Sequence, residues 1–141
     1  MKTNIRAVRQ FLTAAVLLLL TSAPDLFAND EDLINNGRIR YANDCAECHG
    51  AVGRGDGDRG EGLSIRPSDL TALSSANRGQ FPTDYVRRVI DGRDLPSAAH
   101  EQVAMPAWGQ HYQRDLLAYS EEIIQRNIDE LMAYLRSIQI E

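Results

Sequence analysis

The feature that most constrains this chain is the pentapeptide Cys45-Ala46-Glu47-Cys48-His49. In a helical turn, side chains three and four positions apart lie on the same face. Cys45 and Cys48 are three apart and His49 is four after Cys45, so both thiols and the imidazole can face one flat ligand. This C-x-x-C-H spacing is the attachment pattern of c-type haem, in which the thiols form thioethers and the histidine binds iron.

Two nearby cysteines have other uses, which the rest of the sequence disfavours. Both cysteines of the chain belong to this one motif. A thioredoxin-like dithiol belongs with a βαβ pattern, and strand-like alternation is almost absent here. A zinc site needs further ligands, and the remaining histidines, His100 and His111, are eleven apart. A structural disulfide stays open as an alternative, although a two-residue gap makes a poor cross-link.

The beginning of the chain predicts a signal peptide over residues 1–28. A basic start precedes an apolar run of ten residues at 11–20, and Ala28 ends an imperfect small-residue cleavage site. The run is short for a bilayer span, which needs about 20 residues, and an uncleaved membrane anchor is the alternative. Export fits the haem interpretation, because bacteria attach haem covalently outside the cytoplasm. We therefore expect a periplasmic protein with one mature domain, residues 29–141.

Removal of the leader would make the chain more acidic. It takes three of the 15 basic residues and one of the 20 acidic ones, which leaves 12 and 19, a net charge of −7. The mature chain also has no lysine. Nucleic-acid binding is disfavoured, because little is available to neutralise phosphates. The acidic balance favours partners with a basic docking face, although ordinary solubility explains it equally well.

The segment 30–44, which leads into the motif, is predicted to be a helix capped by Asn29 or Asp30. Gly37 and Tyr41 precede the first cysteine at four-residue steps, on one side of this helix. A glycine in a helix interior costs about 1 kcal/mol. A second helix that crosses closely best explains Gly37, and a merely tolerated glycine is the alternative.

Two further helices are predicted, at 83–91 and 120–139. Thr83 would cap the first and Gly92 would end it. Ser120 would cap the second, whose apolar stripe would pack across 30–44 through Leu131, Tyr134 or Leu135. The apolar stripe of the predicted helix 83–91 consists of Tyr85, Val86, Val89 and Ile90.

The thirteen residues 50–62 include six glycines and are predicted to form a loop. Asp69, shortly after this loop, is expected to cap a short helical turn. A histidine that binds a metal usually donates its other ring N–H to a carbonyl or carboxylate. The carbonyl of Pro67 is the candidate acceptor for His49, and a simple turn proline is the alternative.

Met105 is the expected second ligand of the iron, because haem iron in electron carriers is commonly held by His and Met. Pro106 disfavours a helical conformation at Met105 and so presents it rigidly. Met105 follows His49 by 56 residues, enough chain to reach the opposite face of a haem. A gap-filling core methionine is the alternative, and His100 and His111 are the competing ligands.

The remaining aromatic residues near Met105 are assigned to packing. Trp108 and Tyr112 are expected to lie beside the haem or to close the core, and Met132 is expected in the core. Residues 93–104 are predicted to form a loop. The stretch between Gly109 and the last helix is predicted to be a long link. Large apolar residues are scarce outside the end helices, so a buried haem would supply the centre of the core.

At this point the chain resembles a class I, monohaem bacterial cytochrome c over essentially all of residues 29–141. The resemblance implies an all-α cytochrome c fold in which the N- and C-terminal helices cross at Gly37 and Tyr41. It implies one haem c, covalent through the motif cysteines, with His49 and Met105 as axial ligands. The matching blocks are Gly37-x-x-x-Tyr41-x-x-x-Cys45-x-x-Cys48-His49-Gly50, Gly53-x-Gly55-Asp56-Gly57 with Pro67-x-Asp69-Leu70, Met105-Pro106-x-Trp108-Gly109, and Leu131-x-Ala133-Tyr134-Leu135.

The resemblance implies one-electron transfer between redox proteins rather than catalysis, since both axial positions of the iron would be filled. A first alternative is the haem c subunit of a larger periplasmic or membrane oxidoreductase complex. A second is a ligand-binding haem sensor or reductase with a labile sixth site. The chain departs from the family in its long segment 93–104 and in lacking the lysines that surround the haem edge of many carriers.

Overall fold

The computed structural model describes residues 28–95, 105–115 and 120–140, and in these ranges the regular elements are all helices. The expected all-α fold is confirmed. Within these ranges, no helix combines the length and the apolar character needed to cross a bilayer. Apart from Ala28, the predicted signal peptide lies outside the described residues, as does His100. The elements are α2 (Ala28–Asp44), α3 (Ala46–His49), η1 (Asp58–Gly62), η2 (Leu70–Ala72), α4 (Leu73–Ala76), α5 (Thr83–Asp91), α7 (Trp108–Asp115) and α8 (Glu121–Ser137).

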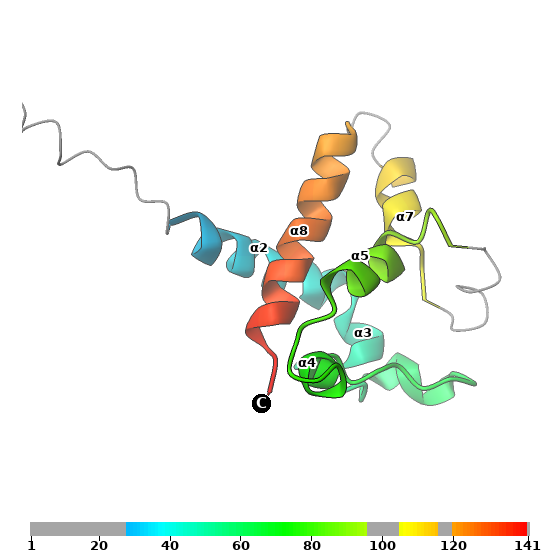
Figure 1. Cartoon of the computed structure of the whole chain (residues 1–141). Coiled ribbons are helices and arrows are strands. Elements are labelled where there is room, and N and C mark those ends of the chain that lie inside the picture. Colours follow the sequence, from blue (N-terminus) through cyan, green and yellow to red (C-terminus); the bar gives the residue numbers. More distant parts are fainter. Residues whose placement is uncertain (1–27, 96–104, 116–119, 141) are drawn as a thin grey trace, which may run out of the picture.

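The two long helices, α2 and α8, cross each other, and α5 and α7 pack beside α8 (Figure 1). The crossing point is Gly37, where a Cβ atom would overlap the carbonyl oxygen of Glu130 and lie 2.9 Å from the Cβ of Tyr134. The ring of Tyr134 lies 5.1 Å from that of Tyr41, centroid to centroid. The prediction that a second helix crosses closely at Gly37 is therefore confirmed.

The core forms around the apolar stripe of α8. Burial of each such side chain contributes about 1.5–3 kcal/mol, so this stripe is a main source of stability. Met132 is only 1% exposed, which confirms its assignment to the core. The buried apolar residues of α8 are Ile124, Ile128, Leu131, Met132, Tyr134 and Leu135, and those packed against them are Tyr41, Val86, Ile90, Trp108 and Tyr112.

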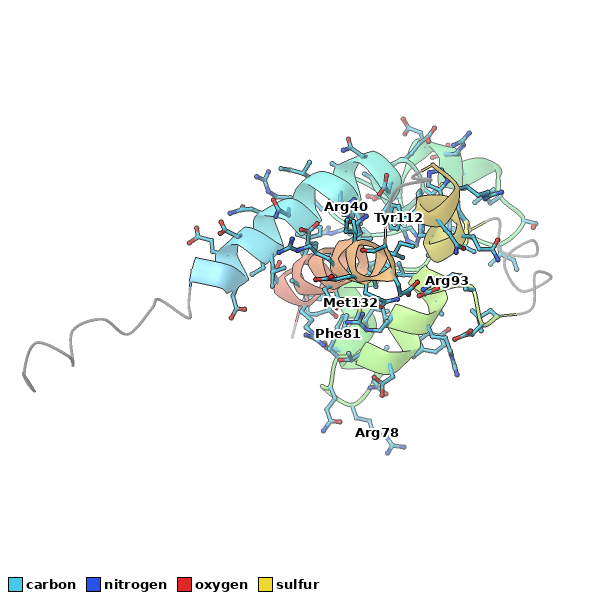
Figure 2. All side chains as sticks on the ribbon, turned by 90° about the horizontal axis from the view of Figure 1, so that it is seen from above. Arg40, Arg78, Phe81, Arg93, Tyr112 and Met132 are labelled. Carbon is cyan, nitrogen blue, oxygen red and sulfur yellow. The ribbon has the colours of Figure 1, made fainter. Side chains whose placement is uncertain are left out.

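Two buried polar side chains of α8 face α2, and the apolar pattern gave no sign of them. Asn127 and Glu130 are 7% and 6% exposed. Arg40 of α2 donates hydrogen bonds to Glu130 at 2.9 Å and to Asn127 at 2.8 Å. Asn36 donates a further bond to Glu130 at 3.2 Å. Figure 2 shows Arg40 close to Tyr112, over whose ring its guanidinium lies at 5.6 Å.

Two predicted N-terminal helix caps are wrong. Helix α2 already begins at Ala28, so Asn29 and Asp30 lie inside it and do not cap it. Helix α5 has Pro82 in the cap position and Thr83 as its first residue. The Thr83 hydroxyl instead accepts a hydrogen bond from Arg136 of α8 at 2.8 Å, which uses the side chain for a tertiary contact.

The other helix ends agree better with prediction. Gly92 ends α5 in the left-handed conformation, with a φ of 68°. Ser120 occupies the cap position of α8, although its carbonyl rather than its hydroxyl accepts the bond from the Ile123 N–H, at 2.9 Å. The predicted link before α8 is wrong in part, because it contains α7. Trp108 and Tyr112, one helical turn apart, are both buried on its inner side.

The C-terminal end of α8 lies beside α4 (Figure 1). The side chain of Gln139 donates to the carbonyl of Leu70 at 2.7 Å and accepts from the N–H of Ser74 at 2.8 Å. The N–H of Ile140 donates to the carbonyl of Thr71 at 2.9 Å. These bonds fasten the segment around η2, which follows the glycine-rich loop, to the main helix pair.

Candidate functional site

The short helix α3 carries the C-x-x-C-H motif and continues almost directly from α2. The N–H of Cys45 still donates to the carbonyl of Tyr41 at 2.9 Å, and the N–H of His49 donates to the carbonyl of Cys45 at 2.9 Å. The buried Tyr41 hydroxyl donates to the carbonyl of Gly50 at 2.6 Å. The motif is therefore held at both ends by the helix that crosses α8.

The glycine-rich stretch after the motif folds back over α3. The N–H of Gly55 donates to the carbonyl of His49 at 2.8 Å, and the N–H of Gly57 donates to the carbonyl of Cys48 at 3.2 Å. These bonds satisfy carbonyls at the end of α3 that have no partner within the helix. The predicted loop 50–62 is thus correct for its first part, while its last residues form η1.

The ring of His49 is oriented by the carbonyl of Ser68, which lies 3.0 Å from Nδ1. The prediction that Pro67 supplies this carbonyl is wrong by one residue. The Pro67 carbonyl instead packs against the backbone of Gly55, where a Cβ atom would overlap it. The predicted cap at Asp69 is confirmed, since its carboxylate accepts from the N–H of Thr71 at 2.9 Å. This capped turn sets the direction in which the Ser68 carbonyl points.

A cavity of about 400 Å³ opens beside α3. Cys45, Cys48 and His49 line it together with Met105, so the structure brings the four predicted haem-attachment and iron-ligand residues to one cavity. Its volume lies within the range of about 300–1,000 Å³ that is usual for ligand sites. The remaining lining residues are Asp44, Leu63, Ile65, Arg66, Pro67, Ser68, Tyr85, Arg88, Val89, Leu95, Pro106 and Trp108.

Helix α5 contributes to the cavity in a way that the sequence did not indicate. Its predicted apolar stripe divides between two surroundings. Val86 and Ile90 are each 6% exposed and belong to the core. Tyr85, which is 60% exposed, and the half-buried Val89 instead line the cavity. The two members of each pair, Val86 with Ile90 and Tyr85 with Val89, are four residues apart and so share one face of the helix. These two neighbouring apolar faces are the signal that α5 packs against two different surroundings.

The side chains near Met105 take different roles. Pro106 and Trp108 line the cavity beside Met105. The ring of the competing ligand His111 lies edge-on to Trp108 with centroids 5.1 Å apart, and His111 is not among the lining residues. The other competing ligand, His100, lies outside the described residues. Of the predicted sixth ligands that the structure describes, Met105 is the one at the cavity.

The pKa values of two motif side chains bear on its chemistry: that of Cys45 disfavours thiol redox chemistry, and that of His49 favours metal binding. Cys45 and Cys48 are not joined by a disulfide. Burial, followed by the nearby charges of Asp44 and Cys48, raises the pKa of Cys45 to about 12. A redox dithiol reacts as a thiolate with a lowered pKa, so Cys45 is poorly suited to that role. Burial lowers the pKa of His49 despite the opposing effect of the Ser68 bond, which keeps the imidazole neutral, the form that binds metals.

These residues fit a covalently bound haem. The cavity is mostly apolar and offers two thiols, an oriented neutral imidazole and a thioether sulfur. Among the residues that the structure describes, no three His, Cys, Asp or Glu side chains are grouped to hold a metal ion directly. An all-α fold with a C-x-x-C-H motif at such a cavity defines a haem protein of the electron-transfer class.

A comparison with protein families supports this assignment. The family model described as Cytochrome c matches residues 34–139, which is more than half of the chain. The chain therefore belongs to the cytochrome c family, whose members bind haem c and transfer electrons. Neither the search of curated proteins nor the search of solved structures found a match.

Proposed function

We propose that this protein is a periplasmic one-electron carrier with a single haem c, attached through Cys45 and Cys48 and ligated by His49 and Met105. The observation that carries the proposal is the shared cavity. His49, whose ring is held by the Ser68 carbonyl, lines the same space as Met105, although the two are 56 residues apart in sequence. A histidine and a methionine at one apolar cavity match the ligand pair of electron-carrying cytochromes.

When bound, the haem supplies reversible one-electron exchange between Fe(III) and Fe(II). The protein supplies the ligands and their surroundings. The His49 Nδ1–H donates to Ser68 and leaves Nε2 to bind the iron. The soft sulfur of Met105 favours Fe(II) and raises the reduction potential relative to two histidines. Pro67 and Trp108 line the cavity and would border a haem bound there.

A carrier fits this site better than a catalyst. With His49 and Met105 both as its ligands, the iron would have no open site for a substrate. Docking on donor and acceptor proteins would then be brief, through an interface typically below about 1,200 Å². The signal peptide that the sequence predicts at 1–28 is the basis for proposing the periplasm, and membrane attachment would follow only if the leader is retained.

The charge of the partners is part of the same proposal. The net charge of −7 on residues 29–141 favours partners with a basic docking face through long-range attraction. The cavity itself is bordered by two exposed arginines, Arg66 and Arg88, so an acidic group on the partner would fit directly beside it. Electron-transfer rates with one basic and one acidic redox protein, measured at several salt concentrations, separate these two contributions.

Optical spectra of the exported haem protein test the ligation. We expect a low-spin c-type spectrum, with an Fe–S(Met) charge-transfer band in the oxidised wild type. Met105→Leu should abolish this band, whereas Met132→Leu, a matched change in the buried core, should leave it intact. A band that is absent in the wild type, or that survives Met105→Leu, would contradict the proposal. Rapid carbon monoxide binding to the reduced wild type would then favour a ligand-binding haem protein.

Whether the protein acts alone or within a complex needs a separate experiment. Tagged protein purified from its own cells at low and at high salt should be free of stoichiometric partners if it is a diffusing carrier. A partner that stays bound at high salt would instead identify this chain as the haem subunit of an oxidoreductase.

A further inference from the structure

An ion-pair cluster joins the end of α5 to the start of α8. Arg93 donates to both oxygens of Asp91, at 2.6 and 2.8 Å, and to both oxygens of Glu121, at 2.7 Å each. Gln125 donates to Asp91 at 3.2 Å and to Glu121 at 3.0 Å. Two forked contacts of one guanidinium give the cluster a defined geometry. Figure 2 shows Arg93 where α5, α7 and α8 come together.

Helix α7 touches this cluster through its backbone at Gly109. A Cβ atom on Gly109 would overlap a carboxylate oxygen of Asp91 and would lie 2.8 Å from Nε of Arg93. Gly109 is buried and is the second residue of α7. The positive N-terminal end of α7 is also a favourable neighbour for the Asp91 carboxylate. The start of α7 is therefore seated directly on the Asp91–Arg93 pair.

The residues that border the cavity precede this contact by a few positions. Met105 lies four residues before Gly109, and Pro106 and Trp108 lie between them. Pro106 limits the backbone freedom of the connection. A shift of the first turn of α7 would therefore move Met105 relative to His49.

We propose that Arg93, acting through Asp91 and Gly109, is a positioning residue that holds Met105 at the haem. The inference rests on the proposed His49 and Met105 ligation. Without the guanidinium, the Asp91 carboxylate faces the Glu121 carboxylate and the negative end of its own helix. Asp91 would then move away from Glu121, and the seat for Gly109 would be lost. The sulfur ligand would spend more time away from the iron.

If Arg93 only stabilises the fold, the variants should show a different pattern, which a comparison with a matched arginine on α5 can reveal. Arg87 of α5 also bridges to α8, through Gln125 at 3.3 Å and through an ion pair with Asp129. Its bridge therefore resembles that of Arg93 in linking the two helices. The Arg93 cluster alone includes the pair on which Gly109 is seated.

The test compares Arg93→Gln, Arg93→Lys and Arg87→Gln in the exported haem protein. Imidazole is the probe, because it competes with methionine for the iron, and the loss of the Fe–S(Met) band reports its binding. We expect Arg93→Gln to bind imidazole about tenfold more tightly than wild type, the factor that corresponds to one charge-assisted hydrogen bond. The imidazole affinity of Arg93→Lys should lie between those of wild type and Arg93→Gln, and the affinity of Arg87→Gln should match that of wild type.

Equal imidazole affinity in Arg93→Gln and Arg87→Gln would overturn the inference. If Arg93→Gln does not fold, Arg93→Lys serves instead, because a lysine keeps the positive charge beside Asp91 but cannot make the forked contacts of the guanidinium. We expect a smaller increase in imidazole affinity for it, and an unchanged affinity would equally overturn the inference. A wild type without the sulfur band contradicts the proposed ligation itself and removes the basis for this inference.

Discussion

The backbone of Gly37 in α2 lies directly against the carbonyl group of Glu130 in α8. No side chain fits between them, because a Cβ atom on Gly37 would overlap that oxygen. Helix α2 leads into the haem-binding motif and α8 carries much of the core, so this one contact sets where the motif lies relative to the core (Figure 1). The two residues are 93 positions apart in the sequence.

Gly37→Ala should destabilise the protein. Alanine is favoured over glycine in a helix by about 1 kcal/mol, but the overlap is with backbone, which must shift by separating the two helices. Such overpacking typically costs about 1–3 kcal/mol, and an overlap with backbone belongs at the upper end of that range. After the gain from alanine, we expect a net loss of about 2 kcal/mol in the free energy of unfolding. Denaturant unfolding measures it, with Gly62→Ala as control because nothing lies within 4 Å of that position. Equal stability of the two variants would contradict the described crossing.

Arg40→Leu should cost more than its partial exposure suggests. The change leaves the carboxylate of Glu130, whose side chain is 8% exposed, without its cation. Breaking a buried pair costs about 3–5 kcal/mol, and since Arg40 is 26% exposed we expect about 2–3 kcal/mol. The double variant Arg40→Leu, Glu130→Leu should recover much of this loss, because it removes the unpaired charge. A double variant that is less stable than Arg40→Leu would contradict this prediction, because it would show that Glu130 stabilises the fold without Arg40, through its bond from Asn36.

Tyr112→Phe should loosen α7 from the haem motif. The Tyr112 hydroxyl donates to Asp44, directly before Cys45, at 2.7 Å. Burial and then this bond raise the pKa of Tyr112, so the hydroxyl stays a donor throughout the neutral range. A hydrogen bond to a charged group contributes about 1.5–3 kcal/mol, and we expect a loss near the lower end. Tyr85→Phe, a change of the same atom at an exposed position, should have little effect on the unfolding free energy.

Acid should weaken the fold through the Arg93 cluster. The hydrogen bonds from Arg93 lower the pKa of Glu121 to about 2 and also lower the pKa of Asp91. Because both values are depressed in the folded state, their stabilisation is complete above the unfolded values of about 4–4.5 and is lost as the pH falls toward 2. The unfolding free energy of wild type should therefore fall more steeply between pH 5 and 2 than that of Arg93→Gln. Parallel curves for the two proteins would refute this prediction.

Much of the candidate site follows from neighbours in the sequence. Four features each depend on a few adjacent residues: the motif itself, the turn capped by Asp69, the end of α5 at Gly92, and the non-helical conformation of Met105 before Pro106. Local spacing and local backbone preferences are sufficient for such features. The close helix crossing could also be inferred, because an interior glycine costs helix stability and so needs a reason.

Only the tertiary structure decided which side chains and backbone groups from different segments contact each other. Ser68 rather than Pro67 faces His49, because the direction of a carbonyl in a turn depends on backbone angles that a residue list does not specify. The same holds for Arg40 and Glu130, which are 90 positions apart. It holds as well for Gly109 on the Asp91–Arg93 pair. By itself the sequence determined the chemistry that the chain can offer, and only the packing of distant segments determined where that chemistry is held.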